Sequence, residues 1–297
     1  MVDATITNRP RNRHAAVGFR ALLLTTVAML AFAGNSLLCR LALRPHAIDP
    51  TSFTLLRVVA GAVTLSLLCA RRPARATVRA GSWRSALALA GYAIAFALAY
   101  VALDAATGTL VLFGAVQVTM LAWGLAHGER PPALAWAGFA AATAGLALLL
   151  LPGVSAPDPA GLALMAVAGI SWGVYSLRGR GTADPVAATA SNFLRAAPLC
   201  VLASGAALGF ATPHLGLEGA VLASVSGAFT SGLGYVIWYA AVRRLSAVQA
   251  AMAQLTVPVL AGLGGVILLG EQPSTRLFLS AVLVLGGVGL AVLARRT

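Results

Sequence analysis

Ten long apolar runs follow one another along the chain, separated by short breaks that contain proline, glycine or arginine. A helix needs roughly 20 apolar residues to cross the hydrocarbon core of a bilayer, and a backbone inside the bilayer must satisfy its own hydrogen bonds. The runs are too long and continuous for barrel strands, so the sequence predicts an all-α integral membrane protein with ten transmembrane helices. We place them at residues 18–39, 52–70, 84–103, 107–126, 133–151, 159–177, 187–209, 218–241, 246–269 and 275–294.

The composition agrees with this prediction. The 297 residues are 59% hydrophobic and 10% charged, whereas soluble domains are near ~45–50% apolar and about 25% charged. The 21 basic residues, all arginine, exceed the 8 acidic ones, but they lie between apolar runs and form no soluble basic face, so we expect no nucleic-acid partner. The three cysteines have no metal-type spacing, and we expect neither a metal nor a cofactor.

The arginines predict the orientation, because cytoplasmic loops of membrane proteins carry an excess of basic residues. With the N-terminus inside, the outer segments hold only Arg40, Arg44 and Arg276, while Arg57 and Arg195 lie within spans. We therefore expect a multi-pass protein of the cell's inner (plasma) membrane, with residues 1–17 as a cytoplasmic tail and both termini in the cytoplasm. The cytoplasmic segments hold the other 16 arginines: Arg9, Arg11, Arg13, Arg20, Arg71, Arg72, Arg75, Arg79, Arg84, Arg130, Arg178, Arg180, Arg243, Arg244, Arg295 and Arg296.

The first run admits a second interpretation. Its basic start, its apolar stretch and Ala31-Phe32-Ala33 resemble a cleavable signal peptide. The run is long for such a peptide, however, and the internal repeat described next needs it as the partner of the sixth run. We therefore interpret it as a membrane helix.

The two halves of the chain, residues 18–151 and 159–294, repeat the same features in the same order. An Asp-Pro pair and an intramembrane arginine mark the second and seventh runs, and a Gly-Glu pair closes the fourth and ninth. The spacing is 138 residues for the arginines, 139 for a pair of tyrosines and 142 for the glutamates, which indicates an internal repeat of five helices. The matched pairs are Asp49-Pro50 with Asp184-Pro185, Arg57 with Arg195, Tyr100 with Tyr239, Gly128-Glu129 with Gly270-Glu271, and Gly145-Leu146-Ala147 with Gly289-Leu290-Ala291.

Five helices are an odd number, so the second copy must enter the membrane from the opposite side. Many secondary transporters use such inverted repeats, whose two halves exchange conformations and open a central site to each side in turn. A receptor or a structural membrane protein does not need this symmetry. The repeat therefore favours a transporter that works by alternating access, with a solute chamber between the halves.

These motifs also carry a family resemblance. The arginine early in the second and seventh runs, the Gly-Glu pair after the fourth and ninth, and Pro258 thirteen residues before Glu271 resemble the EamA-type proteins of the drug/metabolite transporter superfamily. The resemblance spans nearly the whole chain. It implies ten helices in two inverted five-helix repeats around a central cavity, lined mainly by the first, third, fourth, sixth, eighth and ninth helices.

Within that superfamily the chain most resembles bacterial exporters of amino acids and related metabolites, with the YddG-type aromatic amino acid exporters as an example. One departure concerns the bend of the helices. The family's proline in the fourth helix falls at Val116, so a proline kink is expected only at Pro258 in the ninth helix.

Polar and aromatic residues within the runs are the candidate substrate-binding residues, because burying them in lipid is costly without a partner or a wet cavity. Aromatic walls with a few hydrogen-bonding groups suit an aromatic or branched amino acid. The alternatives are interfacial anchoring for the tyrosines, core packing for the aromatic stripes and interhelical hydrogen bonding for the glutamines. The candidates are Asn35, Tyr92, Phe96, Tyr100, Gln117, Trp172, Tyr175, Tyr235, Trp238 and Gln254.

The two intramembrane arginines have two interpretations. Each lies a few residues inside its helix, so its side chain can reach the lipid phosphates by snorkelling. The repeat suggests instead two symmetry-related ion pairs that act as gates, Arg57 with Glu271 toward the outer side and Arg195 with Glu129 toward the inner side. Pro258 is the structural residue of the ninth helix.

The remaining classes of function have less support. Within the sequence, no acidic residue lies at mid-span and no P-loop is found, so neither a buried proton relay nor an ATP site is visible. An intramembrane enzyme acting on lipid or isoprenoid substrates would need clustered Asp, Glu, His or Cys, and a channel or receptor would not need paired halves. We expect a monomeric, non-enzymatic exporter of small organic metabolites, amino acids above all, whose partners are its small-molecule substrate and the lipid bilayer.

Overall fold

The computed structural model describes residues 9–43, 47–103, 105–150, 158–207, 213–269 and 275–293. Within these ranges the regular structure is helical, apart from an isolated bridge between Ile48 and Leu215. The helices are α1 (Arg9–Ala42), α2 (Pro50–Leu68), α3 (Ala74–Ala80), α4 (Trp83–Ala102), α5 (Ala105–Ala126), α6 (Ala133–Leu150), α7 (Pro159–Gly179), α8 (Pro185–Ala207), α9 (Leu217–Val225), η1 (Ser226–Leu233), α10 (Gly234–Val242), α11 (Ala247–Gln254), α12 (Thr256–Leu269) and α13 (Thr275–Leu293).

Each predicted apolar run coincides with a helix or with consecutive helices. Two differences stand out: α1 begins at Arg9, so part of the expected tail is helical, and the break after α2 contains the short helix α3. Seven helices of the described chain are long and apolar enough to cross a membrane: Phe19–Ala42, Pro50–Leu68, Trp83–Ala102, Pro159–Gly179, Pro185–Ala206, Leu217–Val242 and Ala247–Leu268. The segments Val111–Ala126 and Ala133–Gly145 are shorter apolar helices.

Two of these helices are irregular. The eighth run is an α-helix only at its ends, because residues Ser226–Leu233 form a turn of π-helix, η1. The ninth run is interrupted at Leu255, between α11 and α12. Pro258 explains this break, since it has no N–H to donate to the carbonyl of Gln254 four residues earlier. The expected kink in the ninth run is therefore present, whereas the π-helix was not predicted from the sequence.

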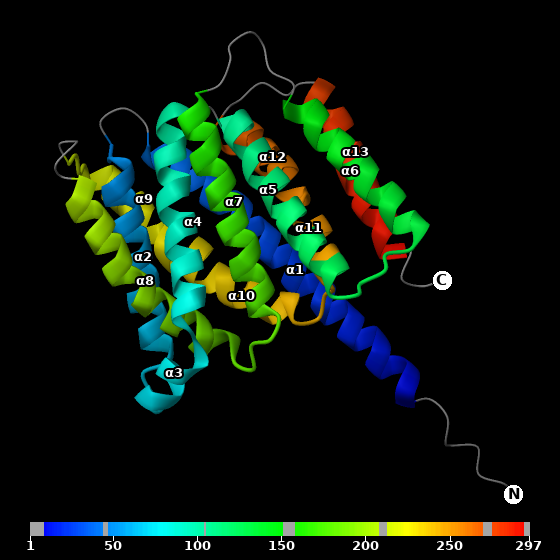
Figure 1. Cartoon of the computed structure of the whole chain (residues 1–297), viewed down its shortest axis with the longest axis horizontal. Helices are drawn as coiled ribbons and strands as arrows, with labels where there is room; N and C mark the ends of the chain where they lie inside the picture. Colours follow the sequence, from blue (N-terminus) through cyan, green and yellow to red (C-terminus); the bar gives the residue numbers. More distant parts are fainter. Residues whose placement is uncertain are drawn as a thin grey trace, which may run out of the picture.

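The helices of the two halves pack against each other across the molecule. α4 and α5 contact α7, α1 contacts α10 and α12, and α2 contacts α8 and η1. α6 and α13 lie side by side at one flank (Figure 1). That pair approaches closely, because a Cβ on Gly287 would lie 2.4 Å from the carbonyl oxygen of Gly138. Small residues at such crossings are typical of membrane helix packing.

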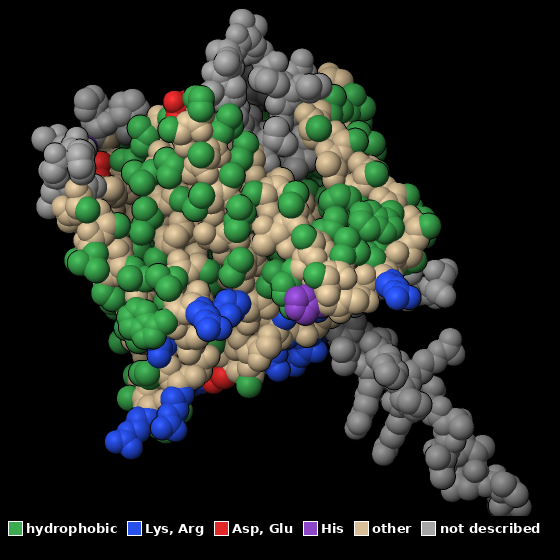
Figure 2. Space-filling view, viewed as in Figure 1, with side chains coloured by type: hydrophobic (Ala, Val, Ile, Leu, Met, Phe, Trp, Pro, Cys, Tyr) green, Lys and Arg blue, Asp and Glu red, His purple; other side chains and the backbone are tan. Residues whose placement is uncertain are grey.

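Basic side chains gather along one edge of the face in Figure 2, and hydrophobic side chains are spread over the rest of that face, among backbone and other side chains. We call this edge the arginine-rich end. Here Arg72 pairs with Asp184, Arg178 Nε donates to Ser85 Oγ over 2.8 Å, and Arg243 donates to the carbonyl of Ala183. Large exposed hydrophobic residues such as Leu202, on the flank, suit contact with lipid.

The two Asp-Pro pairs begin their helices in the same way. Asp49 Oδ1 accepts hydrogen bonds from the N–H groups of Thr51 and Ser52, and Asp184 Oδ1 accepts them from the second and third residues after it. The other carboxylate oxygen of each aspartate contacts the opposite half of the chain. Asp49 Oδ2 accepts from the N–H of His214, and Asp184 Oδ2 pairs with Arg72. Each aspartate therefore caps a helix and links the two halves.

Candidate functional site

A small cavity lies among α1, α4, α5, α7, α10 and α12. These helices correspond to the first, third, fourth, sixth, eighth and ninth predicted runs, the set that the family resemblance implies. The cavity has a volume of about 20 Å³, room for about one water molecule. The expected solute chamber is thus not open in this conformation. The lining residues are Phe32, Asn35, Ser36, Tyr92, Phe96, Leu112, Phe113, Trp172, Tyr235 and Val257.

Aromatic rings fill most of the space around the cavity. Phe32 is central: its ring makes edge-to-face contacts with Trp172, Tyr235 and Trp238 at centroid distances of 5.1, 5.8 and 5.7 Å. Trp172 also lies 5.0 Å from Tyr92 and 4.7 Å from Tyr235. Phe32 was not predicted as a site residue, although it lies three residues before Asn35 and so on the same helical face.

Asn35 connects the cavity to the π-helix. The side chain is buried, and its Oδ1 accepts hydrogen bonds from Ser226 Oγ at 2.7 Å and Ser231 Oγ at 3.3 Å. Both serines belong to η1, so α1 is held to the irregular segment beside the cavity. π-Helical turns of this kind are frequent at functional sites.

The two glutamines join helices behind the cavity wall. Gln254 Oε1 accepts a 2.6 Å hydrogen bond from the indole N–H of Trp172, and its Nε2 donates to the carbonyl of Ala250. Gln117 Nε2 donates to the carbonyl of Ala251 over 2.7 Å. Neither glutamine lines the cavity. The interhelical bonds expected as the alternative for these residues are therefore present.

Three predicted aromatic residues also lie outside the cavity lining. Trp238 donates its indole N–H to Ser176 Oγ at 2.9 Å, and the carbonyl of Tyr175 accepts from the Tyr239 hydroxyl at 3.1 Å. Tyr100 packs edge-to-face on Phe96 at 4.8 Å. Of the ten predicted substrate-binding residues, the structure thus brings together Asn35, Tyr92, Phe96, Trp172 and Tyr235 at the cavity, and places Tyr100, Gln117, Tyr175, Trp238 and Gln254 around it.

Arg57 is buried, with 2% of its surface exposed, so the snorkelling interpretation is wrong for this residue. Its guanidinium carbon lies 5.8, 5.5 and 5.7 Å from the ring centroids of Phe53, Tyr92 and Phe96. Rings at these distances attract a cation through their π faces. Glu271, the expected ion-pair partner, lies outside the described residues.

The expected pair of Arg195 with Glu129 is wrong. Arg195 bonds to Ser191 Oγ and to the carbonyl of Val78 in α3, and its guanidinium lies over the ring of Trp83. The physical reason is that α3 packs against α8 and supplies the carbonyl of Val78, 2.9 Å from Arg195 Nη2. Among the described residues of the second half this short helix has no counterpart, so symmetry did not predict its contacts.

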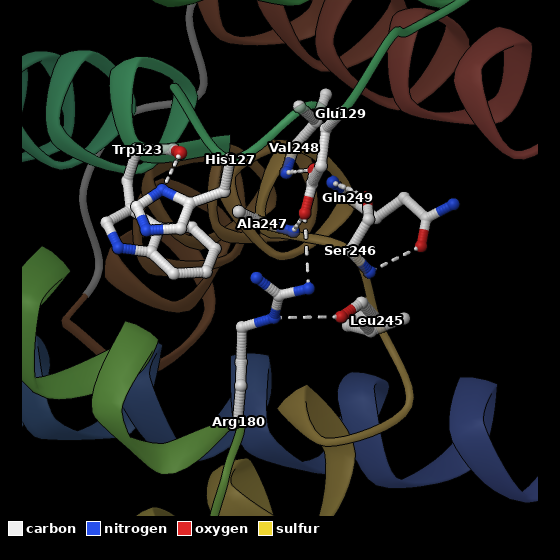
Figure 3. Close-up of polar contacts among 9 residues, drawn as sticks. All are labelled: Trp123, His127, Glu129, Arg180, Leu245, Ser246, Ala247, Val248 and Gln249. Atoms are coloured by element: carbon white, nitrogen blue, oxygen red, sulfur yellow. Dashed lines mark hydrogen bonds and ion pairs between the residues drawn. The ribbon is translucent and has the colours of Figure 1, made fainter. Parts of the chain in front are cut away.

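Glu129 instead connects three helices at the arginine-rich end (Figure 3). Its Oε1 lies 3.1 Å from Arg180 Nη2, which follows α7, and 2.8 Å from the N–H of Ala247. Its Oε2 accepts from the N–H of Val248 at 3.1 Å. A carboxylate at a helix N-terminus is stabilised by the unpaired N–H groups and the helix dipole. The turn that places Glu129 requires glycine, because Gly128 has φ of +81°.

Arg180, the ion-pair partner of Glu129, makes two further contacts. Its Nε donates to the carbonyl of Leu245, and its guanidinium lies 5.0 Å from the ring of Trp123. The Trp123 ring, near the end of α5, stacks on the ring of His127 with 3.9 Å between the ring centroids (Figure 3). The ends of α5 and α7 and the start of α11 are therefore fixed together.

Comparison with known proteins agrees with this fold. The chain is 53% identical over 278 residues to the uncharacterized protein PA1977 of Pseudomonas aeruginosa. The aligned region covers 93% of this chain and 96% of the relative. A crystal structure of a protein with 22% sequence identity superposes with a TM-score of 0.78 over 93% of this chain and 99% of the other, which shows a shared fold.

The helical architecture and the cavity between its halves define a multi-helix membrane protein. Residues 159–293 match the EamA-like transporter family. The second half of the chain therefore contains an EamA-like transporter domain, which supports a place for the protein in the drug/metabolite transporter superfamily.

Proposed function

We propose that the protein is a secondary transporter that exports small organic metabolites, chiefly amino acids with aromatic or other apolar side chains, by alternating access. The observation that carries this proposal is the position of the cavity: α1, α4 and α5 of the first half and α7, α10 and α12 of the second half all contribute to its wall. Aromatic walls with an amide and hydroxyl groups match a small amphipathic solute.

The pattern of helix contacts supports the inverted repeat within this proposal. If the halves exchange places, α1 takes the position of α7, and α4 takes the position of the segment α9–η1–α10. The contact of α4 with α7 then becomes the contact of α10 with α1, while the pairs α2–α8 and α6–α13 map onto themselves. The matching Asp49 and Asp184 caps support the same relation. The arginine-rich end would face the cytoplasm.

Transport requires that the aromatic rings separate, because the cavity now holds about one water molecule. The irregular segments lie where such a movement would bend the helices: Ser226 and Ser231 of η1 bond to Asn35 in the wall, and the break at Leu255 lies two residues before the lining residue Val257. Helices bend most easily at such interruptions. We infer that this conformation is a closed intermediate between the two open states.

The proposal is tested with the purified full chain in liposomes preloaded with a panel of labelled amino acids, with and without a pH gradient. For the wild type, we expect efflux faster than from liposomes that are loaded with the same solute but contain no protein. The variant Trp172→Ala removes a wall residue and should abolish efflux, whereas Trp136→Ala, a half-exposed residue of α6 away from the cavity, should not. Absence of efflux for every solute would overturn the proposal, and steady ion conductance would favour a channel.

A further inference from the structure

The Arg57 guanidinium is a buried cation with unused hydrogen-bonding capacity. Within the described part of the chain, its Nη1 has no hydrogen-bonding partner. A buried charge without a partner is strongly unfavourable, and ionisable residues inside membrane segments are typically kept for function. The fold retains this arginine in α2, buried beside the rings of Tyr92 and Phe96.

The Arg57 guanidinium lies beside aromatic side chains that line the cavity. Tyr92 and Phe96, whose ring centroids are 5.5 and 5.7 Å from it, are both lining residues of the cavity. A rotation of these two side chains, such as the opening of the chamber requires, would bring Arg57 into contact with a bound solute. In the closed conformation the π faces of the rings stabilise the cation.

A second unpartnered group faces the same space. Tyr235 lines the cavity, and its hydroxyl has no partner within hydrogen-bonding geometry among the described residues. An arginine fork and a phenol hydroxyl are both hydrogen-bond donors, and a carboxylate offers two oxygens that accept from them. The described lining residues include no carboxylate that could take this place.

From these observations we propose that Arg57, assisted by Tyr235, recognises the carboxylate group of the transported solute. The substrates are then small organic acids or zwitterions whose apolar part lies among Phe32, Phe96 and Trp172. This proposal rests on the proposed function, because it assigns a substrate class to the same cavity. An ammonium group on the solute is tolerated through the π faces of the rings, but the carboxylate is required.

The backbone of Arg57 packs against η1, one of the irregular segments at which we propose that the helices bend. A Cβ on Gly227 of η1 would lie 2.1 Å from the Arg57 carbonyl oxygen, so α2 and η1 touch at this point. The same π-helix holds Asn35 through Ser226. A change in η1 would therefore shift Arg57 and the cavity wall together.

Efflux of four matched solutes from proteoliposomes tests the proposal: phenylalanine, 3-phenylpropanoate, phenylalaninamide and phenethylamine. The wild type should move the first two at least about tenfold faster than the two without a carboxylate, the effect of one charge-assisted hydrogen bond. Arg57→Gln should remove this preference, and Arg57→Lys should retain part of it. Arg195→Gln, a change in the matching arginine of the other half, should keep the full preference.

If Arg57→Gln does not fold, Tyr235→Phe removes only a hydroxyl and should reduce the preference for carboxylates severalfold. The proposal is overturned if the wild type moves phenylalaninamide as fast as phenylalanine, or if Arg57→Gln keeps the preference. A double variant, Arg57→Glu with Glu271→Arg, that restores transport would overturn it in favour of the ion pair predicted from the sequence. Transport only of solutes without an acidic group would overturn it together with the choice of amino acids as substrates, but would leave the proposed export of small organic metabolites intact, whereas transport of no solute overturns both.

Discussion

The indole N–H of Trp172 donates a 2.6 Å hydrogen bond to Oε1 of Gln254, the last residue of α11 before the interruption at Leu255. Both side chains are buried. The bond joins the first helix of the second half to the irregular ninth run, directly behind the cavity wall that Trp172 lines. The C-terminal end of α11 is thus held by the side chain of a cavity-lining residue.

Replacing Gln254 by leucine should destabilise the protein, because the buried indole N–H loses its acceptor. The expected loss is about 1–3 kcal/mol of unfolding free energy, measured by denaturant unfolding in detergent. Trp172→Phe removes the donor, so the double variant should be less destabilised than the sum of the two single variants. Additive effects would show that the bond contributes nothing.

The contact of Glu129 with Arg180 predicts which charge exchange can be tolerated. Glu129→Arg should destabilise the start of α11, since two N–H groups lose their acceptor and a cation faces the helix N-terminus, by about 1–2 kcal/mol. Adding Arg180→Glu should recover part of the loss, and adding Arg195→Glu should recover none. Thermal unfolding of the wild type and these three variants compares them, and rescue by the Arg195 change would contradict the contact of Glu129 with Arg180.

Asp49 predicts a pH dependence of stability. Partial burial acts to raise the pKa of Asp49, but hydrogen bonds from Ser52, Thr51 and His214 outweigh it and lower the pKa from 3.8 to about 2. Since the folded state favours the charged form, the carboxylate stabilises the fold fully above about pH 4 and loses this effect as the pH falls toward 2.

Asp49→Asn should therefore be less stable near neutral pH and show a flatter decline of stability between pH 4 and 2. Denaturant midpoints in detergent across this range measure the effect. Glu218→Gln, which changes an exposed carboxylate in the first turn of α9, serves as the matched control. An identical decline in the wild type and in Asp49→Asn would contradict the prediction.

Gly227 predicts a steric limit at the crossing of α2 and η1. Gly227→Ala would place a methyl group 2.1 Å from the carbonyl oxygen of Arg57, so the helices must separate. We expect a loss of about 1–3 kcal/mol from this overpacking. Gly114→Ala is the control, because a Cβ at that position would have no atom within 4 Å and alanine favours a helix. Equal stability of both variants, measured by thermal unfolding, would contradict the crossing.

Features set by local chemistry were predictable from the sequence. The apolar runs predicted the helices, and Pro258 predicted the bend of the ninth run, which is interrupted at Leu255. The Asp-Pro pairs lie at the observed starts of α2 and α8, two residues before the predicted runs. The polar and aromatic character of residues within the runs singled out Asn35 and Trp172, which line the cavity in the structure. The Asp-Pro caps and the interruption before Pro258 depend on hydrogen bonds within a few residues of one another, whereas Asn35 bonds to serines of η1 that are distant in the sequence.

Features set by long-range packing were not predictable. The π-helix arises where Gly227 meets the backbone of α2, a contact between segments 170 residues apart (Arg57 to Gly227). Arg195 donates a hydrogen bond to the carbonyl of Val78 because α3 lies against α8. The other half has no counterpart of α3 among the described residues. Symmetry is a poor guide at insertions of this kind, since an extra element changes which partner is nearest.

The double role of the two Asp-Pro aspartates has a consequence for any rocking of the halves. Each carboxylate holds its own first turn with one oxygen and the opposite half with the other. Pulling the halves apart at either end removes a partner from the same group that prevents fraying of α2 or α8. Local unwinding and large-scale tilting are thereby coupled through a single side chain at each end of the molecule.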